Sequence, residues 1–183
     1  MKTPKLNSKY QAFGNDSRYF IVTGGRGSGK SFAANVFLLL LTYERGHKIL
    51  FTRYTMVSAA SSIIPEFIEK LEIMGVVEDF RITKDEITNI KTGSGILFKG
   101  IRTASGNQTA ALKSLNGITT FVLDEAEELT NEDDFDKVLL GAYLLKKYLD
   151  IESASFLTFE NVEVGDKVKL RIGDYNIQKE FNY

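Results

Sequence analysis

A run of small, polar and basic residues near the start of the chain has the composition of a phosphate site. The run consists of Gly24, Gly25, Arg26, Gly27, Ser28, Gly29, Lys30 and Ser31, and it fits the phosphate-loop pattern G-x-x-x-x-G-K-[ST]. Glycines let consecutive backbone N–H groups point at a polyphosphate, and a helix that begins here adds partial positive charge. In such a loop Lys30 reaches the β- and γ-phosphates, and the hydroxyl of Ser31 binds Mg²⁺. The alternative is a glycine-rich turn that binds no ligand.

Two carboxylates form a second candidate site. Asp124 and Glu125 directly follow the apolar and β-branched residues 119–123, which predict a buried parallel strand with both acids at its carboxyl end. In a phosphoryl-transfer site the first acid, Asp124, holds Mg²⁺, and the second, Glu125, orients and deprotonates the attacking water. An acidic turn after a strand is common by itself, but together with a phosphate loop it favours hydrolysis of a nucleotide over binding alone.

The segments around the glycine-rich loop predict the sheet that positions it. Residues 19–22 form an apolar run before the loop, residues 31–45 predict a buried helix closed by Gly46, and residues 48–52 predict a second buried strand. This order is typical of a parallel α/β sheet. Arg53 ends the second strand, where ligands of such sheets bind. We therefore expect it to face phosphate, DNA or a neighbouring subunit, or simply solvent.

The middle of the chain predicts a helix and a hairpin. Helical spacing covers residues 58–74, with a regular start near Pro65 and an end at Gly75. Residues 86–90 and 95–100 alternate in hydropathy and predict a hairpin turned at residues 91–94. The polar residues 101–117 are either a flexible connection or a functional loop beside nucleotide or DNA.

Composition limits the classes of function that remain. The chain has 183 residues, enough for one core, and a formal net charge of −1, so global attraction to nucleic acid or anionic membrane is not expected. It has no cysteine and one histidine, which excludes disulfides, thiolate metal sites and multi-histidine centres. The first residues lack the apolar core of a signal peptide, and the longest apolar stretch, residues 36–41, is too short to span a bilayer. No membrane association is expected.

From residue 19 to about residue 138 the chain resembles the ATPase domain of the large terminase subunit of tailed bacteriophages, over about two-thirds of its length. The features that carry the resemblance are the phosphate loop, Arg53 with Thr55 and Ser58, Thr92-Gly93-Ser94 before residues 96–100, Lys113-Ser114-Leu115, and residues 122–129. It implies a P-loop NTPase of the additional-catalytic-glutamate type, with a mainly parallel sheet flanked by helices. It also implies ATP and Mg²⁺ as cofactors and double-stranded DNA as the moved substrate.

The resemblance assigns further roles and partners. Arg26 acts as an arginine finger within the chain, unless it merely faces solvent, and Gln11, with Tyr10 or Phe13, contacts adenine from an N-terminal arm. The implied partners are the portal protein, the small terminase subunit and further copies in a ring, with a monomer in isolation as the alternative. The place of action is the cytoplasm of the infected bacterial host.

The resemblance ends before the last segment. We expect an arm over residues 1–18, an ATPase domain over 19–140 and a short α+β, β-rich tail over 141–183. The tail predicts a helix at residues 142–148 and strands at 155–159 and 167–172, and it is too short for a nuclease. The Asn-Pro pair that ends the next terminase strand does not occur after Asp124.

The tail leaves alternatives open. Residues 161–168 weakly resemble an early hairpin of self-splicing inteins, but no Cys or Ser opens such an insert near Gly141 or Ala142. A divergent end of the ATPase sheet, or a truncated gene product, is favoured. The hypothesis is a terminase motor domain without its nuclease. The alternatives are a nucleotide-binding fragment with negligible turnover, or a terminase stub with an intein-derived or interaction tail.

Overall fold

The computed structural model describes residues 2, 4–15, 19–55, 62–102, 117–128, 154–159, 167–172 and 175–180. Its helices are η1 (Ser8–Gly14), α1 (Lys30–Leu41), α2 (Ile64–Met74), η3 (Val77–Asp79) and η4 (Ala126–Glu128), where η marks a 3₁₀-helix. Its strands are β1 (Tyr19–Thr23), β2 (Lys48–Thr55), β3 (Phe80–Ile82), β4 (Glu86–Asn89), β5 (Gly95–Arg102), β6 (Thr120–Leu123), β7 (Ala154–Phe159), β8 (Lys167–Ile172) and β9 (Tyr175–Glu180).

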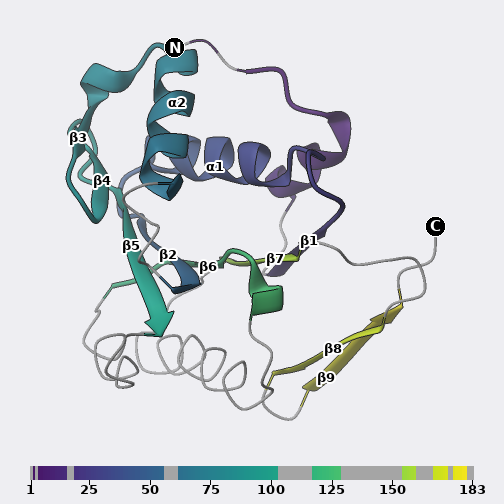
Figure 1. Ribbon diagram of the computed structural model, residues 1–183. Coiled ribbons are helices and arrows are strands. Elements are labelled where there is room, and N and C mark those ends of the chain that lie inside the picture. The colour runs from purple at the N-terminus through teal and green to yellow at the C-terminus, as the bar shows by residue number, and fades with distance from the viewer. Residues whose placement is uncertain are drawn as a thin grey trace.

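A seven-stranded sheet forms the centre of the molecule (Figure 1), in the order β1-β7-β6-β2-β5-β4-β3. The pairs from β1 to β5 are parallel, and β5 continues through antiparallel pairs with β4 and β3. Helices α1 and α2 both lie on one side of this sheet in Figure 1. The predicted α/β class with a mainly parallel sheet is confirmed, as is the β4–β5 hairpin.

Strand β7 lies inside this sheet, between β1 and β6. Thr158 is paired with Val22 of β1, and Leu157 is paired with Leu123 of β6. The alternating pattern of residues 155–159 predicts a strand, which we expect from the sequence to belong to a tail beyond residue 140. In the structure it is instead an inner strand of the main sheet. This arrangement corresponds to the alternative in which the segment completes the sheet.

The last two strands form a sheet of their own. β8 and β9 pair antiparallel, with Leu170 opposite Ile177. The strand at 167–172 is predicted from the sequence, whereas β9 is not. The predicted helix at residues 142–148 lies outside the described residues.

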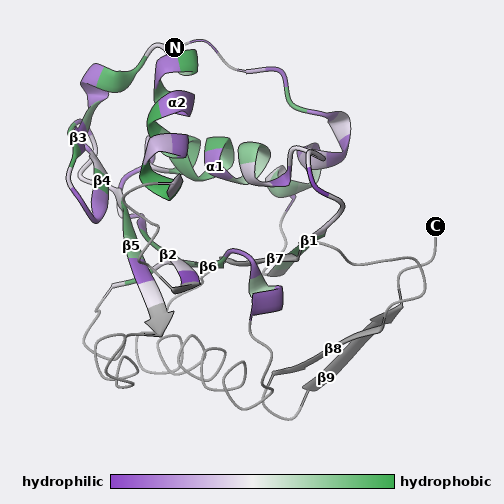
Figure 2. Cartoon of the chain, in the orientation of Figure 1, coloured by the Kyte–Doolittle hydropathy of each residue, from purple (hydrophilic) through white to green (hydrophobic). Residues whose placement is uncertain are grey.

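Helix α1 is mostly apolar (Figure 2), and most of its residues are buried. It ends at Leu41, four residues before the predicted end at Arg45. The Thr42 hydroxyl donates to the backbone oxygen of Leu39 at 2.6 Å, and the chain then turns out of the helix. Gly46, at φ 88°, therefore belongs to the later turn and is not the cap of the helix.

Helix α2 begins and ends where its sequence predicts. Pro65 occupies the first turn, and Gly75 ends the helix in the left-handed conformation at φ 65°. Phe67 anchors α2 to the sheet through edge contacts with Phe51 of β2 and Phe98 of β5, with ring centroids 5.5 and 5.2 Å apart. α2 is thereby held over the strand that delivers Arg53.

The N-terminal arm contains a 3₁₀-helix that the sequence does not predict. The Asn7 side chain accepts a hydrogen bond from the backbone N–H of Lys9 and caps the start of η1. Phe13 packs edge-on against Phe20 of β1 and contacts Phe37 of α1, with centroids 5.8 and 5.5 Å apart. The expected packing of the arm on the first strand is confirmed.

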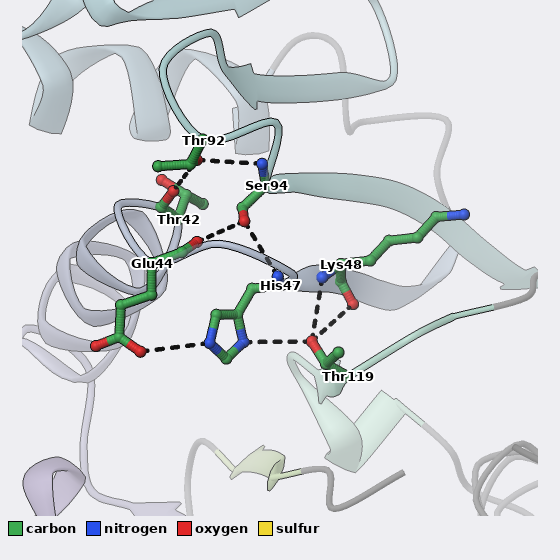
Figure 3. Close-up of polar contacts among 7 residues, drawn as sticks. All are labelled: Thr42, Glu44, His47, Lys48, Thr92, Ser94 and Thr119. Carbon is green, nitrogen blue, oxygen red and sulfur yellow. Dashed lines mark hydrogen bonds and ion pairs between the residues drawn. The ribbon is translucent and has the colours of Figure 1, made fainter. Parts of the chain in front are cut away.

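Hydroxyl side chains tie the β4–β5 turn to the end of α1 (Figure 3). Thr92 Oγ1 donates to the backbone oxygen of Thr42 at 2.6 Å. Ser94 Oγ donates to the backbone oxygen of Glu44 at 2.5 Å and accepts from the backbone N–H of His47 at 3.1 Å. Because α1 begins at the glycine-rich loop, these bonds fix the end of the helix opposite that loop.

Within the described part of the chain, no helix is long and apolar enough to cross a membrane.

Candidate active site

The glycine-rich loop connects β1 to α1 and adopts a conformation that requires glycine. Gly27 and Gly29 have φ angles of 77° and 83°, in the left-handed region that L side chains avoid. A Cβ at Gly24 would lie 3.2 Å from Ser28 Oγ. The loop backbone is thus free to lie close to a bound group, and Arg26 is exposed at its tip.

Lys30 is folded back onto this loop. Its ammonium donates to the backbone oxygens of Gly24 at 2.5 Å and Gly25 at 3.2 Å. The residue is only 3% exposed, although an ammonium group is costly to bury without partners. The charge is therefore held where the loop would enclose an anion, through bonds that a phosphate oxygen can replace.

The N-terminal arm contacts the glycine-rich loop through Tyr10. The Tyr10 hydroxyl donates to the backbone oxygen of Ser28 at 2.8 Å, and its ring lies 3.9 Å from where a Cβ at Gly29 would stand. Tyr10 stacks on Phe13, and both residues are buried. Neither ring therefore offers an open face for adenine, whereas Gln11 is exposed.

Asp124 emerges at the carboxyl end of β6, two strands from the loop. Its backbone N–H donates to the backbone oxygen of Thr52 at 2.9 Å, and the Thr52 hydroxyl donates to the backbone oxygen of Val122 at 2.7 Å. β6 and β1 both pair with β7, so their ends are separated by two strand spacings, roughly 10 Å. Asp124 is 5% exposed and its position is fixed by backbone pairing.

Arg53 bridges both candidate catalytic acids. Its Nε donates to Asp124 Oδ2 at 2.7 Å, and a terminal nitrogen lies 2.6 Å from the same oxygen. That nitrogen also lies 3.3 Å from Glu125 Oε1. The prediction that Arg53 faces phosphate, DNA, a neighbouring subunit or solvent misses this contact, because β2 and β6 are adjacent only in the folded sheet.

Electrostatics agree with this geometry. Burial lowers the pKa of Arg53, but the charge of Asp124 and the hydrogen bond to it outweigh burial, with further support from the charges of Glu125 and Glu66. The net pKa is raised, and the guanidinium stays charged. Partial burial of Glu66, at the start of α2, raises the pKa of its carboxyl against the opposing charges of Arg53 and Lys70.

Glu125 has an unusual backbone. Its φ of 54° makes it the one non-glycine residue with positive φ in the described segments. Such a conformation costs about 1 to 2 kcal/mol for an L residue and is often found at functional sites. The turn that follows, η4, is closed by the Glu128 N–H donating to the Glu125 backbone oxygen at 3.0 Å. At this turn the Glu125 carboxylate is in contact with the Arg53 guanidinium.

The donor atoms fit the magnesium ion that the loop pattern implies. Ser31 supplies a hydroxyl and Asp124 a carboxylate, the hard oxygen ligands that Mg²⁺ prefers. No group of three or more His, Cys, Asp or Glu side chains suited to a metal occurs among the residues that the structure describes. Nucleotide-bound Mg²⁺ requires no such cage, since one or two side chains, phosphates and waters complete its shell.

Comparison with known proteins shows the fold. The Thermus phage P74-26 large terminase ATPase domain matches with a TM-score of 0.60 and 17% identity, over 97% of this chain and 78% of that one. The HK97 bacteriophage large terminase matches with a TM-score of 0.63 and 12% identity, over 89% of this chain and 34% of that one. The Phi-28 gp11 DNA packaging motor matches with a TM-score of 0.51 and 20% identity, over 81% and 48%. These likenesses confirm the predicted fold, which is that of large terminase ATPase domains.

A protein-family profile also matches most of the sequence. No curated protein matched the chain. The chain spans only about a third of the length of the HK97 protein, 34%. The profile of the family described as phage terminase large subunit matches residues 16–152, which is most of the chain and includes both the phosphate loop and the Asp124–Glu125 pair. The chain therefore belongs to the phage terminase large subunit family.

Proposed function

We propose that this chain is a Mg²⁺-dependent ATPase, the motor domain of a terminase that drives double-stranded DNA into a procapsid. The observation that carries the proposal is that the glycine-rich loop and the two acids lie at the same edge of the sheet. A phosphate loop with its buried lysine follows β1, and a strained, arginine-bound pair of acids follows β6. A loop for phosphate alone would not need the second set.

The residues divide the work by their chemistry. The loop backbone and Lys30 bind the phosphates of ATP, and Ser31 and Asp124 hold Mg²⁺, which neutralises charge on the transferred phosphoryl group. Glu125 accepts the proton of the attacking water at a carboxylate oxygen. Arg26, exposed at the loop tip, stabilises transition-state charge, a contribution worth roughly 10³ to 10⁵ in rate elsewhere. The exposed Gln11 contacts the adenine.

Membership of the family supports a proposal for the assembly. The motor acts on double-stranded DNA as a homo-oligomeric ring on the portal protein, with the small terminase subunit, in the cytoplasm of the infected bacterium. The proteins similar to this chain include a DNA packaging motor. Stimulation of ATP turnover by added double-stranded DNA is the direct measurement of this part of the proposal.

Phosphate release from ATP tests the catalytic assignment. Glu125→Gln should lower turnover by at least about 100-fold, since general-base catalysis contributes 10²- to 10⁴-fold, while binding of ATP is retained. Glu128→Gln is the matched control, because Glu128 is exposed three residues further on and loses the same charge. Equal turnover in the two variants would show that Glu125 is not the base.

A second candidate keeps nucleotide binding without turnover. It is favoured by one observation, that Arg53 engages both acids at once. Wild-type protein that is stabilised by ATP and Mg²⁺ against heat but releases no phosphate would establish this second function instead.

A further inference from the structure

Arg53 lies among three carboxylates, of which it binds two. Asp124 and Glu125 are in contact with its guanidinium. The third, Glu66, belongs to the first turn of α2, and its charge contributes to the raised pKa of Arg53. Among the residues that the structure describes, no hydrogen bond or ion pair holds the half-buried Glu66 carboxylate.

The packing of α2 brings Glu66 to the end of β2. Phe51 and Arg53 are two residues apart on the strand and therefore project from the same face of the sheet. Phe67 of α2 packs on Phe51 with ring centroids 5.5 Å apart, and Glu66 immediately precedes Phe67. The start of α2 thus lies over the face of the sheet from which Arg53 projects.

The neighbouring lysine, Lys70, does not form an ion pair with the Glu66 carboxylate. Lys70, one helical turn further along, is buried and has its ammonium 2.6 Å from Glu69 and over the ring of Phe32. The partly desolvated Glu66 carboxylate is therefore not bound by its i+4 lysine and is open to another cationic partner.

We propose that Glu66 is a positioning residue that receives the Arg53 guanidinium when Mg²⁺ and ATP displace it from Asp124 and Glu125. This rests on the proposed function, because Asp124 and Glu125 must be released before they serve Mg²⁺ and water. A displaced guanidinium in this largely buried place needs a new anionic partner, and Glu66 is the third carboxylate whose charge acts on it. The exchange breaks the Arg53 contacts with both acids and forms one with Glu66. The contact between Arg53 and the start of α2 would then form only when nucleotide is bound.

Nucleotide binding with and without magnesium tests the exchange. With the non-hydrolysable analogue AMP-PNP and Mg²⁺, Glu66→Gln should raise Kd about tenfold, in the range of coupling between contacting residues. With AMP-PNP in EDTA, Kd should stay within about twofold, because Asp124 is not required by the phosphate loop alone. Glu72→Gln, which neutralises an exposed acid of the same helix, should match the wild type in both conditions.

A double-mutant cycle completes the test. In an Arg53→Met background, Glu66→Gln should have no further effect on the Mg²⁺-dependent Kd, and Arg53→Gln serves as the background if the Met variant does not fold. Additive effects would overturn the proposal, as would equal binding by the Glu66→Gln and Glu72→Gln proteins. Failure of the wild type to bind AMP-PNP would overturn the proposed function, and this inference with it.

Discussion

The Arg53 guanidinium and the Asp124 carboxylate lie 2.6 Å apart at the carboxyl ends of two neighbouring parallel strands. Both side chains are nearly excluded from solvent, at 12% and 6% exposure. A buried ion pair of this kind adds little net stability as a pair, but removal of one partner leaves an uncompensated charge.

The first prediction follows from this asymmetry. Arg53→Met should lower the free energy of unfolding by about 3 to 5 kcal/mol, measured by urea denaturation. Arg45→Met, at an exposed arginine, should change it by less than about 0.5 kcal/mol. Asp124→Asn added to Arg53→Met should recover part of the loss, and a double variant weaker than the single one would contradict the account.

The second prediction concerns the backbone of Glu125. Because φ is 54°, Glu125→Gly should be more stable than Glu125→Ala by about 1 to 2 kcal/mol, as both remove the same side chain and only Gly relieves the strain. At Glu128, which ends η4, the order should reverse, with Ala ahead by about 0.5 to 1 kcal/mol. Chemical denaturation of the four variants gives both comparisons, and the same order at both sites would refute the strain.

The third prediction concerns the bond between the arm and the phosphate loop. Tyr10→Phe removes the hydroxyl that donates to Ser28 and should cost about 1 kcal/mol of stability together with a several-fold loss of nucleotide affinity. Tyr43→Phe removes a similar bond to Asp79, away from the loop. It should lower stability comparably while leaving nucleotide affinity unchanged. If Tyr10→Phe and Tyr43→Phe lost nucleotide affinity to the same extent, the effect would not be local to the loop.

The fourth prediction is a pH dependence. The folded-state pKa of Glu66 is raised, chiefly by burial. The stability it contributes is therefore present below its unfolded pKa of about 4.3 and is lost as the pH rises through the folded value. Relative to the wild type, Glu66→Gln should gain stability as the pH is raised from about 4 to 7, whereas Glu72→Gln should not. Urea denaturation across this range measures the difference, and a constant difference would contradict it.

The fifth prediction concerns β7. A chain of residues 1–159 keeps this strand and should unfold cooperatively, whereas a chain of residues 1–153 lacks a strand that pairs with both β1 and β6 and should lose its cooperative transition. Thermal unfolding followed by circular dichroism distinguishes them. If residues 1–153 fold as well as 1–159, β7 is dispensable and the segment is a separate tail after all.

Much of the site was predictable because its signals are local. The loop residues 24–31 and the pair Asp124–Glu125 are each contiguous in sequence, and each needs only a strand before it to be placed at the sheet edge. The same holds for the start of α2 near Pro65 and its end at Gly75, where backbone preferences of single residues set the limits. The roles predicted for the site residues remain predictions, those of Lys30, Ser31, Asp124 and Glu125 as well as those of Arg26 and Gln11.

The sequence by itself determined which groups are available: a phosphate loop, two acids at a strand end and an α/β order of elements. The tertiary structure alone decided the order of the strands, and with it the place of β7 between β1 and β6. It also decided the partners of Arg53, since a residue at position 53 meets one at 124 only after β2 and β6 have paired. The physical reason is that parallel pairing joins segments far apart in sequence, and neither hydropathy period nor residue spacing along the chain carries that information.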